Sequence, residues 1–201
     1  MKGKLIHIST DYVFDGNSFL PYQELDEVNP IGVYGNTKRS GELSVINSNI
    51  DGIVIRTSWL YSAYGNNFVK TMLRLGNERD KLGVIFDQVG TPTNASDLAK
   101  TCLDILSYKK ESNINTKGKI YHFSNEGVAS WYDFAIAIMD LGKVNCNLNP
   151  IETKDYPTPA KRPHFSVLNK SKIKKDFEIE IPFWRDSLAV CISKLNNNNN
   201  K

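Results

Sequence analysis

The chain has 201 residues, of which 40 % are hydrophobic and 23 % charged, with a formal net charge of +3. This composition is ordinary for a globular protein and excludes a disordered chain, while the net charge is too small to indicate a nucleic-acid partner. No apolar run approaches the roughly 20 residues of a membrane span and no signal-peptide pattern opens the sequence, so we expect no membrane association and a cytoplasmic location.

The first third of the chain alternates apolar runs with amphipathic stretches. Residues 4–9 predict a short buried strand, and the loop STDYVFDG follows it. A helix is expected over residues 31–47, after Pro30, and the run GIVIR at residues 52–56 predicts a second buried strand. The next helix, over residues 67–77, places its apolar side chains on one face.

The same alternation continues to the end of the chain. Ser96 and Ser130 are plausible N-caps, each at the start of an amphipathic stretch. The elements expected here are strands at 82–86 and 119–123 and helices at 96–108, 130–142 and 184–195. Between the last two helices, YPTPAKRP is too rich in proline for a helix or a central strand.

Strands that alternate with helices at this spacing predict an α/β fold with a doubly wound parallel sheet. We expect residues 1–195 to form one substrate-binding and catalytic portion of such a fold. Residues 196–201 close the chain with an asparagine-rich segment that cannot bury apolar surface, so a disordered tail is predicted there.

Polar residues at the strand ends are the first candidates for chemistry, because ligands of open parallel sheets bind outside the carboxyl ends of the strands. Thr10 and Asp11 follow the first strand. Taken alone, such residues are more often turn formers and helix caps. Tyr34 and Lys38 strengthen the case, since residues four apart share one face of a helix.

A phenol beside an ammonium group can exchange a proton with a carbinol or ketone oxygen, because the positive charge favours the phenolate. A hydroxyl such as that of Thr10 could orient the same oxygen. The YxxxK spacing is weak evidence by itself. Its weight comes from the strand-end hydroxyl that precedes it.

Several stretches in order resemble the dTDP-4-dehydrorhamnose reductases of the extended short-chain dehydrogenase/reductase superfamily. They include STDYVFDG, NPIGVYGNTKRSGE, IRTSWLYSAYGNNFVKTML, DQVGTPTNASDLA, YHFSNEGVASWYDFA and YPTPAKRP. The resemblance implies NADPH or NADH as cofactor and reduction of a dTDP-4-keto-6-deoxysugar to dTDP-L-rhamnose. It also implies a Rossmann-like sheet with a small α/β substrate-binding region.

The resemblance assigns roles to individual residues. Tyr34 would protonate the C4 oxygen of the sugar, and Lys38 would assist it and hydrogen-bond the cofactor ribose. Thr10 and Asp11 would contact the sugar.

Two further residues carry an alternative beside the implied role. Trp59 would pack against the deoxysugar, although a tryptophan after a strand is often a core residue. Asn67 would hold part of the nucleotide, although it could simply cap the following helix. The basic residues between 161 and 175 are either a solvated face or a positive surface near a phosphate-bearing ligand.

No metal is expected. Some relatives use an acidic residue after GTPTNA in a magnesium-bridged dimer contact, and this chain has Ser96 at that position. Neither the metal nor that dimer is carried over, although a homo-oligomer is possible.

The sequence has no GxxGxxG or GxGxxG after a strand, the turn that receives the pyrophosphate of a dinucleotide. We therefore expect the first strands and the glycine-rich turn of the fold to be absent, and a separately encoded N-terminal half is one candidate source of them. The alternative is a non-catalytic binding or regulatory subunit, resembling the regulatory subunit of methionine adenosyltransferase.

Overall fold

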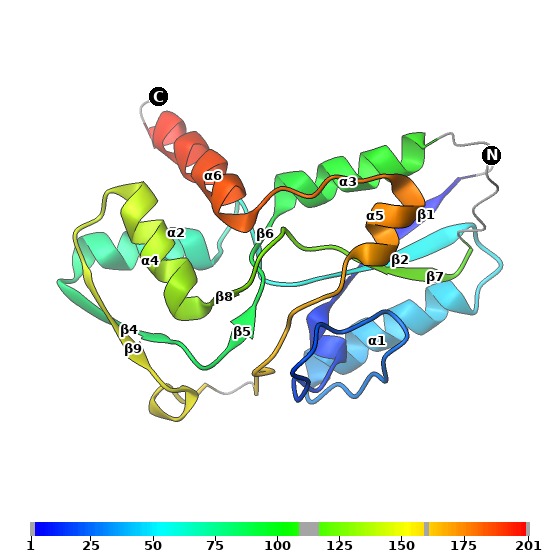
Figure 1. Ribbon diagram of the computed structural model, residues 1–201, viewed down its shortest axis with the longest axis horizontal. Helices are drawn as coiled ribbons and strands as arrows, with labels where there is room; N and C mark the ends of the chain where they lie inside the picture. The colour runs from blue at the N-terminus through cyan, green and yellow to red at the C-terminus, as the bar shows by residue number, and fades with distance from the viewer. Residues whose placement is uncertain (1–2, 109–116, 159–160, 200–201) are drawn as a thin grey trace.

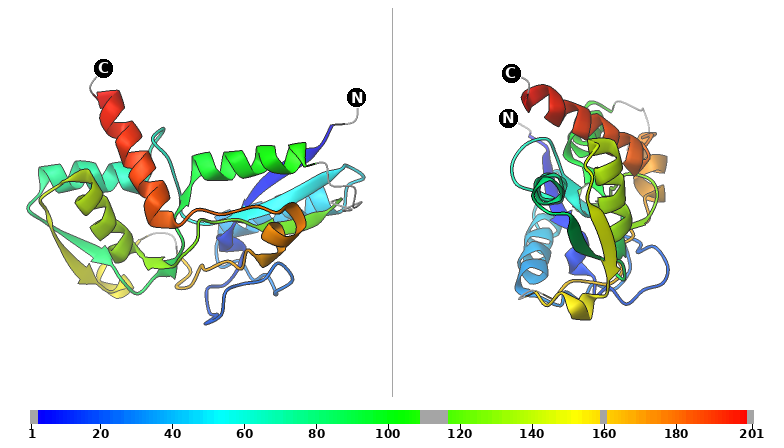
Figure 2. Two further views of the ribbon diagram at one scale, coloured as in Figure 1. Left: turned by 45° about the horizontal axis from the view of Figure 1, so that its top comes forward. Right: turned by 90° about the vertical axis from the view of Figure 1, so that its left-hand side faces the viewer.

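The computed structural model describes residues 3–108, 117–158 and 161–199. Two α/β parts lie side by side along the long axis of the molecule (Figures 1 and 2). One part holds a three-stranded parallel sheet, and the other is built around a two-stranded parallel pair. The parallel α/β architecture expected from the sequence is confirmed.

The three-stranded sheet has the order β1-β2-β7, with β1 at Leu5–Thr10, β2 at Gly52–Thr57 and β7 at Lys119–His122. Its register sets Thr10 opposite Thr57 and Arg56 opposite His122, so the carboxyl ends of the strands lie together. β2 is buried along its whole length, as its apolar, β-branched sequence predicts.

Helices cover both faces of this sheet. Helix α1, Val33–Ile46, packs on β1 and β2. Helices α3, Ala95–Ser107, and α5, Ser171–Phe177, lie on the opposite face, where Leu98 and Ile173 join Ile53 and Ile55 of β2 in one apolar cluster. The sheet is therefore wound on both sides (Figure 1).

The second part pairs β4, Lys81–Ile85, with β9, Asn147–Ile151. Helices α2, Phe68–Glu78, α4, Trp131–Gly142, and α6, Trp184–Asn199, pack around this pair and enclose the largest apolar core. Phe134 and Leu188, both fully buried, lie at its centre.

Short elements link the two parts. β3, Leu60–Tyr61, pairs with β6, Thr93–Asn94, and β5, Val89–Gly90, pairs with β8, Ala129–Ser130. Two single-turn 3-10 helices complete the fold, η1 at Asp11–Val13 and η2 at Thr153–Asp155. No helix in the described part of the chain is long and apolar enough to cross a membrane.

Three local expectations are corrected. Helix α3 is capped by Asn94, whose side chain accepts a hydrogen bond from the Ser96 amide, because Asn94 is the residue with extended backbone before the first turn. Strand β9 and helix α5 were not expected at all. β9 contains Pro150, which an edge position in a two-stranded pair tolerates.

The asparagine-rich end also differs from the prediction. Residues 196–199 continue helix α6 instead of starting a disordered tail, and residues 200–201 lie outside the described residues. Extending an existing helix adds one hydrogen bond for each residue that is fixed, so a helix can run on through residues of low propensity.

Candidate active site

Thr10 and Asp11 form a buried polar corner at the carboxyl end of β1. The Thr10 hydroxyl accepts a hydrogen bond from the Tyr12 amide at 3.2 Å, which caps η1, and donates to Asp11 Oδ1 at 2.9 Å. Asp11 Oδ2 is buried and has no hydrogen-bond partner of normal geometry within the described residues. Burial raises the pKa of Asp11 to about 6, against the opposing effect of the Ser166 and Thr10 hydroxyls.

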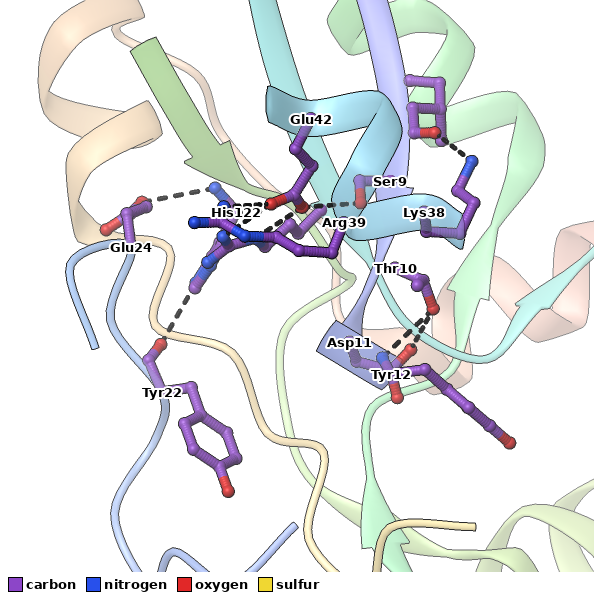
Figure 3. A network of polar contacts seen from close by, with 12 residues as sticks. Ser9, Thr10, Asp11, Tyr12, Tyr22, Glu24, Lys38, Arg39, Glu42 and His122 are labelled. Carbon is purple, nitrogen blue, oxygen red and sulfur yellow. Dashed lines mark hydrogen bonds and ion pairs between the residues drawn. The ribbon is translucent and has the colours of Figure 1, made fainter. Parts of the chain in front are cut away.

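Helix α1 brings Tyr34 and Lys38 to this corner. Gly35 makes the approach possible, because a Cβ at that position would lie 2.2 Å from the Tyr12 carbonyl oxygen. The Tyr34 ring meets the Tyr12 ring edge to face, with 5.6 Å between the ring centroids, and remains 57 % exposed. Lys38 Nζ donates to the Ile8 carbonyl oxygen at 2.5 Å (Figure 3). Tyr34, Lys38, Thr10 and Asp11 thus gather at one end of β1.

Trp59, which follows β2, contacts the second part of the molecule. Its ring stacks on Trp131 with 3.6 Å between the centroids and 7° between the planes, and it packs against the apolar core of the second part. A Cβ on Gly90 would lie 2.7 Å from the Trp59 ring, so the strand β5 also contacts it. These contacts support the core alternative for Trp59, while its contact with the deoxysugar stays a prediction.

Asn67 caps helix α2. Its Oδ1 accepts from the Lys70 amide at 3.3 Å, and its Nδ2 donates to the Ser62 carbonyl oxygen at 2.8 Å. Both ends of the side chain amide are therefore used within the protein.

A cavity of about 460 Å³ lies between α2 and β4. Its apolar wall includes Phe68 and Trp131, and three cationic side chains line it as well: Arg79, Lys81 and Arg162. The charge of Arg162 also acts on Tyr12 in the group at β1. Burial and the Asp11 charge raise the pKa of the Tyr12 phenol, and the positive charge of Arg162 opposes them. Arg162 therefore lines the cavity and also acts electrostatically on Tyr12, the residue that contacts Tyr34.

The sequence interpretation missed a buried ion pair behind Lys38. Glu42 on α1 and Arg56 on β2 are joined by two hydrogen bonds of 2.8 Å, and both side chains are at most 1 % exposed. Burial raises the pKa of Glu42, but hydrogen bonds from Arg56, its charge, and bonds from Ser9 and Arg39 hold it below its usual range. The available signal was the spacing of four that puts Glu42 on the face of Lys38.

His122 lies beside this pair (Figure 3). Its Nδ1 is 3.1 Å from the Tyr22 carbonyl oxygen, and its amide donates to Glu24 Oε1 at 3.2 Å. Burial and the charge of Arg56 lower the pKa of His122 to about 3, so the ring is neutral. Across residues 3–108, 117–158 and 161–199, no three His, Cys, Asp or Glu side chains gather as a metal site.

Comparisons with known proteins agree with the motifs. The family model described as RmlD substrate binding domain matches residues 1–197. A dTDP-4-dehydrorhamnose reductase of Aggregatibacter actinomycetemcomitans is 46 % identical over 92 % of this chain and 64 % of its own length, and one of Escherichia coli K12 is 39 % identical over 95 % and 65 %. The chain thus spans just under two thirds of the length of these curated relatives.

Solved structures give the same result. A dTDP-4-dehydrorhamnose reductase from Clostridium acetobutylicum superposes with a TM-score of 0.87 at 41 % identity, covering 96 % of this chain and 66 % of that one. A reductase of the same name from Bacillus anthracis, in complex with NADP, has a TM-score of 0.87 at 36 % identity over 95 % and 66 %. The chain therefore belongs to the family of the RmlD substrate binding domain, together with the dTDP-4-dehydrorhamnose reductases that it resembles.

Proposed function

We propose that this chain is the substrate-binding and proton-donating portion of a dTDP-4-dehydrorhamnose reductase. The reaction is the reduction of the C4 ketone of dTDP-4-dehydro-6-deoxy-L-mannose by NADPH or NADH, which gives dTDP-L-rhamnose. The observation that carries the proposal is that Tyr34 contacts Tyr12, Lys38 binds the Ile8 carbonyl and Thr10 lies between these two at the carboxyl end of β1, in a chain whose named relatives are such reductases.

Tyr34 acts as the general acid. It is exposed at the site, and its ring is fixed by the edge contact with Tyr12, so its hydroxyl can reach a bound ketone oxygen. Thr10 orients that oxygen, and Asp11 Oδ2, buried without a partner of normal geometry among the described residues, accepts a hydrogen bond from a sugar hydroxyl.

The nicotinamide cofactor, when bound, supplies the hydride. An ammonium group has three donors, and the Ile8 carbonyl takes one donor of Lys38, so the residue can hold a ribose hydroxyl as well. The fit is partial, because the sequence contains no glycine-rich turn for the pyrophosphate. We propose that a separate segment carries that turn.

The cavity between α2 and β4 suits the nucleotide part of the substrate. The ring of Trp131 offers an apolar surface for a base, and Arg79, Lys81 and Arg162 offer positive charge for a diphosphate. Arg162, whose charge also acts on Tyr12, would place the diphosphate so that the sugar reaches Tyr34. Trp59 supports Trp131 from behind in this arrangement.

The test pairs the chain with the part of the Escherichia coli relative that it does not match, co-expressed to supply the glycine-rich turn. We expect NADPH to be oxidised only when the keto sugar is present. Tyr34→Phe should lower kcat by about 10²- to 10⁴-fold with little change in sugar-nucleotide affinity. Tyr64→Phe is the matched control, because Tyr64 is 75 % exposed and remote from this group in its contacts.

Two measurements separate the two functions that the sequence left open: calorimetry with dTDP-L-rhamnose reports binding, and NADPH oxidation with the keto sugar reports reduction. Binding with Tyr34-dependent reduction supports the reductase. Binding with no reduction by the paired protein contradicts it and favours the non-catalytic binding subunit.

A further inference from the structure

Helix α1, which carries Tyr34 and Lys38, is held on the sheet mainly by polar contacts. Its buried residues are Gly35, Glu42 and Val45, so Val45 is the one large apolar side chain among them. Apolar contacts are non-directional and would let a helix rotate or slide. Besides the close approach of Gly35 to the Tyr12 carbonyl, the orientation of α1 therefore depends on the contacts of its polar side chains.

Glu42 makes the most extensive of these contacts (Figure 3). Its Oε1 accepts from Ser9 Oγ at 2.6 Å and from Arg56 Nε at 2.8 Å, and its Oε2 accepts from Arg56 Nη2 at 2.8 Å and Arg39 Nη1 at 2.9 Å. A two-pronged bond between a guanidinium and a carboxylate fixes direction as well as distance. Glu42 is thereby locked to β1 and β2 at once.

The partner of Glu42 on β1 is a neighbour in sequence of a residue proposed to take part in the reaction. Ser9 immediately precedes Thr10, and the carbonyl that Lys38 binds belongs to Ile8. Lys38 is one helical turn from Glu42, and Tyr34 is one turn further along the same face. A rotation of α1 that broke the Glu42 bonds would move Lys38 and Tyr34 away from Thr10.

We propose that Glu42, together with Arg56, is a positioning residue of the reductase site, which fixes the rotation and axial position of α1 so that Tyr34 and Lys38 face Thr10. The catalytic meaning of this inference rests on the proposed function. The attachment of α1 to the end of β1 does not depend on the proposed function, because it follows from the hydrogen bonds of Glu42 and Lys38.

A gain in stability does not explain why the Glu42–Arg56 pair is buried. Removing two charges from water is costly, and well-packed apolar residues of similar volume often replace a buried ion pair with no loss of stability. Arg56 is not even fully satisfied, since its Nη1 has no hydrogen-bond partner within the described residues and the guanidinium lies over the Phe14 ring, 5.0 Å from its centroid. The gain from the pair is orientation.

The experiment uses the paired protein described above and the double variant Glu42→Leu/Arg56→Met, which replaces the pair by apolar side chains. We expect the melting temperature to stay within a few degrees of wild type, while kcat falls by about 10²-fold, the cost of a misplaced catalytic group. KM for the sugar nucleotide should change little, because the cavity between α2 and β4 is untouched. Asp104→Asn, which breaks the exposed Lys100–Asp104 pair, is the control and should match wild type.

Arg56→Lys provides a second variant if the double variant does not fold. Lysine keeps the charge but cannot make the two-pronged bond, so we expect a folded protein with reduced kcat. A wild-type kcat in a folded double variant, or in folded Arg56→Lys, would overturn the proposal.

A readout without turnover separates this inference from the proposed function. If the wild-type pairing reduces no keto sugar, the proposed function fails. The positioning role is then decided by the nuclear Overhauser contact between the Tyr12 and Tyr34 rings. We expect that contact in wild type and Asp104→Asn, and its loss in the double variant; an unchanged contact would refute the positioning role.

Discussion

Replacement of Trp59 by alanine tests whether this residue belongs to the core or to the sugar site. The ring stacks on Trp131 at 3.6 Å, contacts β5 at Gly90 and is only partly exposed. Truncation of a fully buried tryptophan costs about 3–5 kcal/mol. Because part of the Trp59 ring is in solvent, we expect a loss of roughly 3 kcal/mol, at the low end of that range.

Urea denaturation followed by circular dichroism measures this loss. Trp59→Phe keeps a stacked ring and should lose less than Trp59→Ala. Leu25→Ala is the control, because Leu25 is 96 % exposed and its truncation should change the free energy of unfolding by no more than about 0.5 kcal/mol. A loss below about 1 kcal/mol for Trp59→Ala, with a sharply raised KM for the sugar nucleotide, would refute the packing role.

Two further substitutions probe the corner at β1. Burial raises the pKa of Asp11 to about 6. Between about pH 4 and pH 6 the carboxyl group is therefore protonated in the folded protein and ionised in the unfolded chain. Above pH 6 it is ionised in both states, and its burial then lowers the free energy of unfolding. Asp11→Asn should therefore raise the free energy of unfolding at pH 7 by at most about 3 kcal/mol. In urea titrations this gain should vanish near pH 4. An equal gain at both pH values would contradict this reasoning. Gly35→Ala should push α1 away from the Tyr12 carbonyl and lower kcat of the paired protein. Gly32→Ser is the control and should not lower kcat, because no atom lies within 4 Å of a Cβ added at that position. Equal rates for the two variants would argue against the close approach of Gly35.

The sheet and the shared helix face of Tyr34 and Lys38 were predictable because their signals are local. The run GIVIR lies in β2, and Tyr34 and Lys38 share a helix face because they are four positions apart. Strand β9 was not predictable in this way, since its apolar content is low, it contains Pro150, and its partner β4 lies more than sixty residues earlier in the chain.

The contacts around the site depend on tertiary structure. Arg56 follows three apolar residues in a strand, and nothing near it in sequence shows that its partner is Glu42 on the preceding helix. The stacking of Trp59 on Trp131 could not be predicted, because Trp131 comes from a helix far along the chain. Asn94 and Ser96 are both good N-caps, and only the extended backbone of Asn94 decides between them.

The central claim is that Tyr34 completes the reduction of a sugar ketone, and isotope transfer tests it most directly. The paired protein is supplied with NADPH carrying deuterium at the transferable position and with dTDP-4-dehydro-6-deoxy-L-mannose, and the product is analysed by mass spectrometry and NMR. We predict dTDP-L-rhamnose with deuterium at C4, formed about 10²- to 10⁴-fold more slowly by Tyr34→Phe. No deuterated product, or equal rates for wild type and Tyr34→Phe, would contradict the claim.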